Sequence, residues 1–326
     1  MKNFLRALPA LRPALTTHLT ALLFCGPAAF ASATPAVANL PASVQRVVFL
    51  GDSITHSGFY VACIEAYFLT RHPERLIEFI NLGLSSETVS GLSEDGHAGG
   101  AFPRPDLHER LARVLAQTKP DLVFACYGMN DGIYLPYEAT RAQAFALGIA
   151  RLRTAVLAVP ARLVHLTPPP FDNGKGTNPH YAGVLERYSA DLNAHRGEGW
   201  DVIDTNSLLT LAIRAQRVSE PAFTFAKDGV HPDERGHAVM ARAVLNHLGA
   251  ADLPAGLNAA DLFTNYPQGA ALLNLVRTRQ ALMKDAWLTA TGHKRPMKPG
   301  LPLPEARVRA ATLDAEIRAL IRPPTQ

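Results

Sequence analysis

Ser53 is the first residue of this chain whose type and position could do chemistry. The apolar run Val47–Leu50 is typical of a short buried strand, and Gly51-Asp52-Ser53 follows it directly. Ser53 is therefore expected just past the carboxyl end of a strand, where open α/β sheets bind their ligands. Because Gly-Asp-Ser is also an ordinary turn composition, a nucleophilic role needs a base, an orienting acid and oxyanion donors elsewhere in the chain.

The segment Asp228-Gly229-Val230-His231-Pro232 could supply the base and the acid. An Asp-x-x-His spacing lets one short loop present both groups, so that Asp228 orients His231 while the other ring nitrogen faces a serine. The alternative is a surface turn whose aspartate caps the following helix.

The other histidines are weaker candidates for the base. His237 begins the apolar stripe of a predicted helix, so we expect a partly buried structural histidine. Four more lie in predicted loops or on exposed faces, namely His56, His180, His195 and His293. Of these, His56 is close enough to Ser53 to line a pocket.

Two further strand ends offer donors for an oxyanion. Asn81-Leu82-Gly83 ends the second predicted strand, and Tyr127-Gly128-Met129-Asn130-Asp131 ends the third. Glycine leaves its backbone N–H open to a ligand, and the Asn130 side chain is an amide donor. Turn chemistry is the alternative for each segment. A parallel sheet, however, would bring all three strand ends together at one edge.

Short apolar runs rich in β-branched residues alternate with helical patterns as far as about residue 250. The runs are Arg46–Leu50, Leu76–Leu82, Leu122–Cys126, Leu163–Thr167 and Val202–Ile203. The helical patterns cover about residues 59–72, 106–118, 138–158, 180–196, 207–218 and 236–248. Such alternation implies parallel pairing through right-handed crossovers, so we predict a three-layer α/β/α sandwich around a five-stranded parallel sheet.

Residues 251–326 have a different character. We expect a helix at about 269–288, a loop rich in proline and glycine, and a final helix with apolar residues at helical spacing up to Ile321. The regular stripe of the final helix predicts that it, and with it the extension, packs on the main domain, and a solvated tail is the alternative. The extension could wall the active-site groove or cover an exposed sheet edge or helix face.

Residues 1–33 read as a secretory signal, with cleavage possible up to residue 38. The apolar run Ala21–Phe30 follows a positive start and is too short to span a membrane. Phe24 stands before Cys25 where a bacterial lipoprotein signal requires a small residue, which argues against a lipid anchor. We therefore predict a secreted or periplasmic protein without a membrane span.

Charge and cysteine content narrow the function classes. The formal charge is +4, and the first 38 residues carry three of the 32 basic residues and none of the 28 acidic ones, which leaves 29 against 28. This balance shows no basic stripe of the kind that nucleic-acid binding needs.

After signal cleavage only Cys63 and Cys126 remain, and we expect two buried free thiols, with a single disulfide as the alternative. No Cys/His cluster has zinc spacing, so no metal or cofactor is expected.

Taken together and in order, these segments resemble the sequence blocks of the SGNH hydrolases, also called the GDSL esterase/lipase family. The resemblance covers about 185 residues and stops near Leu248. It implies a flavodoxin-like SGNH hydrolase fold over residues 39–250, with 251–326 outside the family core. It also implies Ser53 as nucleophile, His231 as base and Asp228 as the orienting acid. The oxyanion hole would comprise Gly83, Asn130 and the Ser53 backbone N–H.

The resemblance gives the neighbouring aspartates structural roles. Asp52 is expected to hold the nucleophile loop through local hydrogen bonds, and Asp131 is likewise expected to be structural. The absence of Gly-x-Ser-x-Gly disfavours the larger α/β-hydrolase fold.

The function that this resemblance implies is a serine esterase with a covalent acyl-enzyme. Because the chain looks secreted and has no long apolar lid-like stretch, we expect a carbohydrate O-acetylesterase that acts on poly- or oligosaccharides. A lipase, arylesterase or thioesterase of the same family is the alternative. A non-catalytic carbohydrate-binding module is disfavoured because Ser53, Asp228, His231 and Asn130 are all present. The substrate-binding residues cannot be named from the sequence.

Overall fold

The structure is a computed structural model that describes residues 40–175, 178–250, 253–254, 256–263, 266 and 268–321. The predicted secretory signal lies outside the described residues. The described residues belong to one compact unit.

The predicted five-stranded parallel sheet is confirmed. Its strands are β1 (Arg46–Gly51), β2 (Glu78–Asn81), β3 (Leu122–Cys126), β4 (Arg162–Leu166) and β5 (Asp201–Ile203). They lie in the order β2-β1-β3-β4-β5, and each neighbouring pair is parallel. β2 begins two residues later than predicted. Leu76 is apolar enough to suggest a strand, but it is 91% exposed and precedes the pairing.

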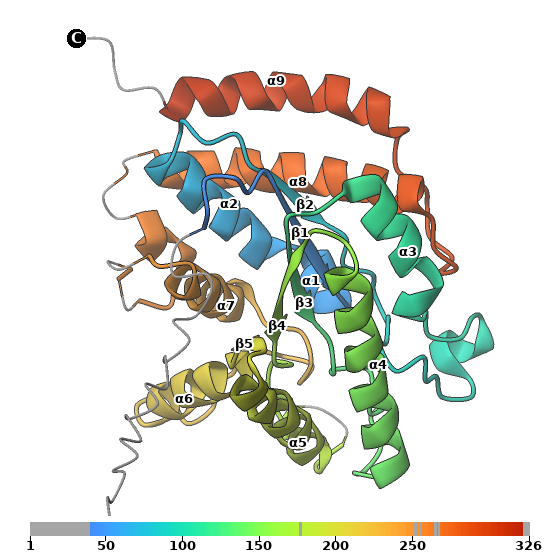
Figure 1. The fold of residues 1–326 in the computed structure, drawn as a ribbon. Coiled ribbons are helices and arrows are strands. Elements are labelled where there is room, and N and C mark those ends of the chain that lie inside the picture. The colour runs from blue at the N-terminus through green and yellow to red at the C-terminus, as the bar shows by residue number, and fades with distance from the viewer. Residues whose placement is uncertain are drawn as a thin grey trace, which may run out of the picture. The chain divides into compact units, whose positions relative to one another are not determined.

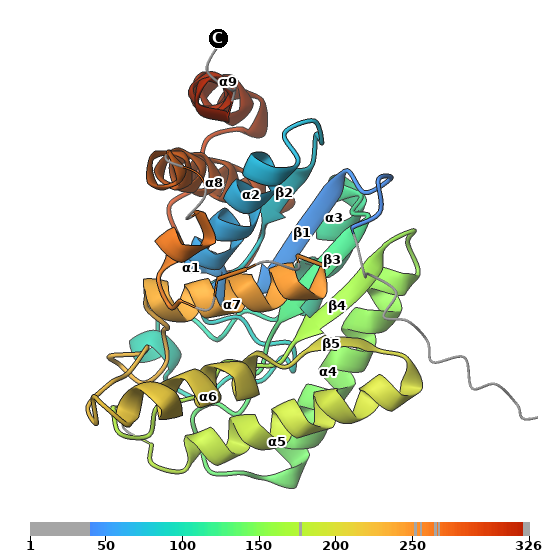
Figure 2. The same ribbon diagram turned by 90° about the vertical axis from the view of Figure 1, so that its left-hand side faces the viewer.

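Helices cover both faces of the sheet, so the three-layer architecture is also confirmed (Figures 1 and 2). They are α1 (Ser53–Ser57), α2 (Phe59–Arg71), α3 (Leu107–Thr118), α4 (Ala139–Leu157), α5 (Tyr181–Ala194), α6 (Thr205–Arg217), α7 (Glu234–His247), α8 (Gly269–Thr291) and α9 (Leu303–Ile321). Figure 2 shows α2 and α7 on one face of the sheet, with α3 and α4 on the other.

The connections explain this division and predict where a ligand binds. The chain leaves β1 for the edge strand β2 and then returns past β1 to β3. Right-handed crossovers in opposite directions place their helices on opposite faces. The reversal lies between β1 and β3, and the carboxyl ends of strands at such a point form the ligand crevice of open α/β sheets.

The C-terminal extension packs on the domain through its first helix. α8 lies against α2 and beside the edge strand β2, and α9 packs on the outer side of α8 (Figures 1 and 2). The Gln280 side chain donates to the Phe79 carbonyl of β2 at 2.8 Å, so α8 satisfies part of an edge that would otherwise be unpaired. The final helix is not a solvated tail, because α9 buries Ala306, Ala310 and Ile317, but it packs chiefly on α8 rather than on the main domain.

The two cysteines are free and buried, as predicted. Cys63 lies on α2 and Cys126 on β3. Burial raises the pKa of both thiols, which makes them unreactive small apolar side chains. In the part of the chain that the structure describes, no helix is both long enough and apolar enough to cross a membrane.

Candidate active site

The structure brings Ser53, His231 and Asp228 together across 178 positions of sequence separation. The Ser53 hydroxyl lies 2.8 Å from Nε2 of His231, and Nδ1 of His231 lies 2.6 Å from Oδ2 of Asp228. With a proton on Nδ1 donated to the carboxylate, Nε2 is free to accept the serine proton. This is the geometry of a nucleophile, its general base and an orienting acid.

The loop that carries His231 is held by its own aspartate. Oδ1 of Asp228 accepts the backbone N–H groups of Val230 and His231, so one carboxylate fixes both the main chain and the imidazole. Partial burial alone would raise the pKa of Asp228. The hydrogen bonds from the His231 ring and from these two amides outweigh it and lower the pKa below its ordinary value. Asp228 therefore stays ionised beside the histidine.

Ser53 opens the five-residue helix α1, which the sequence pattern did not reveal. Asp52 caps this helix, because its Oδ1 accepts the backbone N–H of Ile54 at 2.9 Å. Asp52 is buried, and it is Asp228 and not Asp52 that binds the His231 ring, which agrees with the predicted structural role of Asp52. The Ser53 N–H belongs to the first turn of α1 and has no acceptor within the helix, so it is available to a ligand.

Gly83 contributes close packing in the structure. A Cβ at this position would lie 2.3 Å from the His56 nitrogen and 2.5 Å from the Thr55 carbonyl carbon, so only glycine lets the end of β2 lie against α1. The Gly83 N–H is donated to Oδ1 of Asn81 at 2.9 Å. Its role as an oxyanion donor stays a prediction. In this conformation the amide is already used.

Asn130 is held in one orientation from both ends of its amide. Its Oδ1 accepts the Tyr134 hydroxyl, and its Nδ2 donates to the Glu87 carbonyl, each at 3.1 Å. The amide nitrogen has two hydrogens, so the second remains for an oxyanion. Asp131, the next residue, accepts the amides of Val89 and Ser90, which ties the strand-end loops together as a structural residue would.

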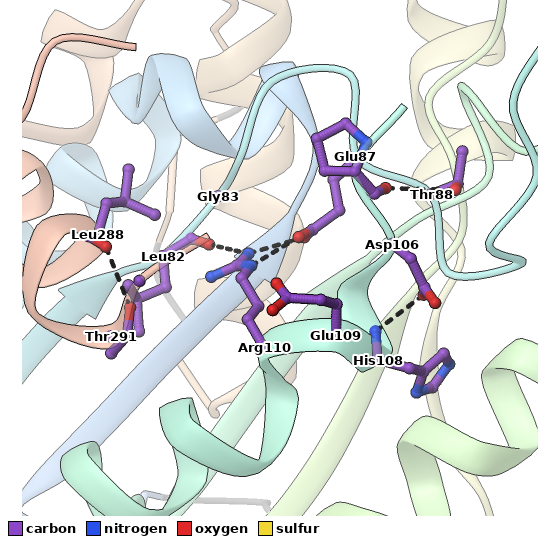
Figure 3. A network of polar contacts seen from close by, with 12 residues as sticks. Leu82, Gly83, Glu87, Thr88, Asp106, His108, Glu109, Arg110, Leu288 and Thr291 are labelled. Atoms are coloured by element: carbon purple, nitrogen blue, oxygen red, sulfur yellow. Dashed lines mark hydrogen bonds and ion pairs between the residues drawn. The ribbon is translucent and has the colours of Figure 1, made fainter. Parts of the chain in front are cut away.

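A buried ion pair supports the loop that holds Asn130. Arg110 of α3 binds both carboxylate oxygens of Glu87, at 2.6 and 2.7 Å, and also donates to the Leu82 carbonyl at 2.7 Å (Figure 3). The Tyr127 hydroxyl donates to the same carboxylate at 2.6 Å. One buried guanidinium thus fixes both ends of the loop between β2 and Thr88.

Sequence reasoning missed Glu87, Arg110, Tyr127 and Tyr134. Of these four residues, only Arg110 occupies a sequence position that indicates a buried ion pair. It stands at helical spacing between Leu107 and Val114 on the buried face of α3, where a charged side chain needs a partner. Its partner could not be named from the sequence, because the two residues meet only in the folded chain.

The remaining histidines have structural positions. His237 is buried, more completely than predicted, and its Nε2 lies 2.9 Å from the Ser57 hydroxyl. His56 lies one helical turn from Ser53, and its Nδ1 lies 3.0 Å from the Gly83 carbonyl oxygen. His180, His195 and His293 lie outside the contacts of Ser53 and His231.

Residues 49–239 match the sequence model of the GDSL-like lipase/acylhydrolase family. The chain is also 25% identical over 233 residues to an acetylxylan esterase of Geobacillus stearothermophilus, a match that covers 64% of this chain and 95% of that protein.

Solved structures show a similar fold. A gut microbial diltiazem-metabolizing enzyme, BT4096, matches with a TM-score of 0.51 and 23% identity. That match covers 63% of this chain and 47% of the other, so the chain spans about half the length of that protein. A catalytic mutant of the acetylxylan esterase Axe2 from Geobacillus stearothermophilus matches with a TM-score of 0.49 and 21% identity, over 63% and 94% of the two chains.

Replacing Arg110 by Met should destabilise the protein by about 3–5 kcal/mol, because the Glu87 carboxylate would stay buried without its partner. Urea unfolding measures this loss. The double variant Arg110→Met/Glu87→Gln should recover part of it, since glutamine carries no charge. Arg309→Met removes an exposed ion pair of α9 and should cost less than about 1 kcal/mol. Equal losses for Arg110→Met and Arg309→Met would contradict the importance of the buried pair.

Asp52→Asn should change the pH dependence of stability. Burial raises the pKa of Asp52 to about 7, whereas an unfolded aspartate titrates near its ordinary value of 3.8. Below that ordinary value Asp52 is protonated in both the folded and the unfolded protein, so its ionisation does not change the free energy of unfolding. As the pH rises toward 7 the folded state loses stability, by up to about 4 kcal/mol.

Asparagine keeps the cap without ionising, so the variant should gain stability over the natural protein between pH 4.5 and pH 8 in thermal unfolding. Asp191→Asn, at an exposed position on α5, should show no such trend. A stability difference between Asp52→Asn and the natural protein that is the same at both pH values would contradict the buried, protonated Asp52.

Proposed function

The chain belongs to the GDSL-like lipase/acylhydrolase family, and we propose that it is a serine esterase that removes acetyl groups from poly- or oligosaccharides. The observation that carries the proposal is the continuous contact from Ser53 through His231 to Asp228. The similarity to an acetylxylan esterase supports the acetyl and carbohydrate part of it. The signal-like N-terminus supports a secreted or periplasmic location, where such polymers are accessible.

Acylation begins when Ser53 Oγ attacks the ester carbonyl and its proton passes to Nε2 of His231. The carbonyl oxygen then becomes an oxyanion. As the tetrahedral intermediate collapses, the bond to the sugar oxygen breaks and His231 returns the proton to that oxygen. The products of this half-reaction are a free sugar hydroxyl and an acetyl ester on Ser53.

Deacylation repeats the steps with water. His231 takes a proton from the water as its oxygen attacks the acetyl carbonyl, and the proton then returns to Ser53 Oγ as acetic acid leaves. Asp228 remains ionised throughout and stabilises the imidazolium that forms in each half-reaction. Its lowered pKa suits this role.

The oxyanion donors are the Ser53 N–H and the second hydrogen of Asn130 Nδ2. The loop after β2 contributes a further donor. Because the Gly83 N–H is bonded to Asn81, we assign that donor to the half-buried Ser86, which has a left-handed φ of 67° and precedes the Glu87 that holds Asn130. Such donors lower the barrier because they are fixed before charge develops on the oxygen.

Acetate release from acetylated xylan and xyloglucan tests the proposal. The natural protein should release acetate from at least one of them and should hydrolyse p-nitrophenyl acetate faster than p-nitrophenyl octanoate. Ser53→Ala should lower kcat by about 10⁴- to 10⁶-fold, because the nucleophile is lost. Ser219→Ala, at an exposed position beyond α6, is the matched control and should keep full activity.

Two outcomes would contradict the proposal in different ways. A preference for octanoyl or longer esters would favour a lipase of the same family. Unchanged turnover in Ser53→Ala would remove the assignment of the nucleophile itself.

A further inference from the structure

Helix α1 has only five residues, so the carbonyls at its carboxyl end lack backbone N–H partners within the helix and need other hydrogen-bond donors. Three successive backbone carbonyls each accept a hydrogen bond from one side chain. Ser57 Oγ donates to the Ile54 carbonyl at 2.8 Å, and Asn81 Nδ2 donates to the Thr55 carbonyl at 2.7 Å. The third donor comes from the C-terminal extension.

Lys284 of α8 is that third donor. Its Nζ donates to the His56 carbonyl at 2.9 Å and lies 3.4 Å from His56 Nε2. The His56 ring faces the Gly83 carbonyl with Nδ1, which places the proton there and leaves Nε2 as the acceptor for the lysine. One ammonium group therefore holds both the main chain and the side chain of the residue one turn beyond Ser53.

The contact suits the electrostatics of the helix. A cation at the carboxyl end of a helix interacts favourably with its dipole, and the effect is larger where the site is partly buried. The Lys284 side chain is 13% exposed, and its nearest acid is Asp285 at 3.8 Å, half of which faces solvent. The charge of Lys284 is thus directed mainly at α1.

Helix α8 is anchored so that Lys284 reaches this position. Gln280 lies one turn before Lys284 and donates to the Phe79 carbonyl and to Glu65 of α2. Residues four apart share one helix face, so the same face of α8 binds the sheet edge and the nucleophile helix. Figure 2 shows α8 beside β2 and α2, on the side of the sheet where α1 lies.

We propose that Lys284 is a positioning residue of the esterase site, through which the C-terminal extension holds the nucleophile helix. The proposal rests on the proposed function for its catalytic consequence. The matched family region ends at residue 239, so this contact comes from a part of the chain that lies beyond it. The extension is thereby both a cover for the β2 edge and a working part of the active site.

The test compares Lys284→Met with Lys284→Arg in the full chain, using p-nitrophenyl acetate. Lys284→Met should lower kcat by about 10- to 100-fold with KM changed by less than about threefold, because small misplacements of a nucleophile are costly. Amide hydrogen exchange of the segment 52–58, followed by mass spectrometry, should become about tenfold faster. Lys284→Arg keeps a donor and a charge and should retain most of the activity.

Two controls separate positioning from general stability. Gln280→Met removes two hydrogen bonds of α8 without touching α1, while the Arg279–Glu65 ion pair and the buried apolar face of α8 still hold Lys284 in place. It should lower Tm while kcat and the exchange of residues 52–58 stay unchanged. Lys298→Met removes an exposed lysine of the same extension and should leave all three quantities unchanged.

The proposal is overturned if Lys284→Met keeps kcat within twofold and the exchange of 52–58 is unchanged. It is also overturned if Gln280→Met reproduces both effects, since the cause would then be undocking of α8. A natural protein that hydrolyses no ester would instead refute the proposed function, and the exchange comparison would still decide whether Lys284 holds α1.

Discussion

A single helical turn must hold Ser53 within reach of His231, and α1 is too short to be stable by itself. Its order comes from contacts at both ends. Asp52 caps the amino end, while Asn81 and Lys284 satisfy carbonyls at the other. The absence of a side chain at Gly83 lets β2 approach closely. The catalytic geometry therefore depends on strand ends, a distant helix and one missing Cβ.

The side of the site where the oxyanion is predicted to bind is built in a different way. There the supports are buried charges, because Arg110 binds Glu87 and the Glu87 backbone holds Asn130. Removing either Arg110 or Glu87 would leave the other charge buried and unpaired, so this pair constrains the loop more strongly than a surface ion pair could. Preorganised donors of this kind are what a developing oxyanion requires.

Much of this arrangement could be predicted from the sequence, and the failures have physical causes. The strands and the long helices follow from apolar periodicity. Ser53 follows from its place at a strand end, and Asp228 and His231 follow from their spacing and from the family resemblance. Helix α1 was missed because five residues are too few for a periodic signal. The hydrogen bond from the Gly83 amide to Asn81 could not be seen in the sequence, and the predicted donor role of Gly83 stays a prediction. Lys284 gave no signal, since its contact with His56 spans 228 positions.

Covalent labelling with a fluorophosphonate probe tests the central claim, that Ser53 is a nucleophile activated by His231. Peptide mapping by mass spectrometry should place one label per chain on the peptide that contains Ser53. His231→Ala should slow the labelling by at least about 10³-fold, because the base that takes the serine proton is lost. A label on another residue, or labelling that does not depend on His231, would contradict the assignment.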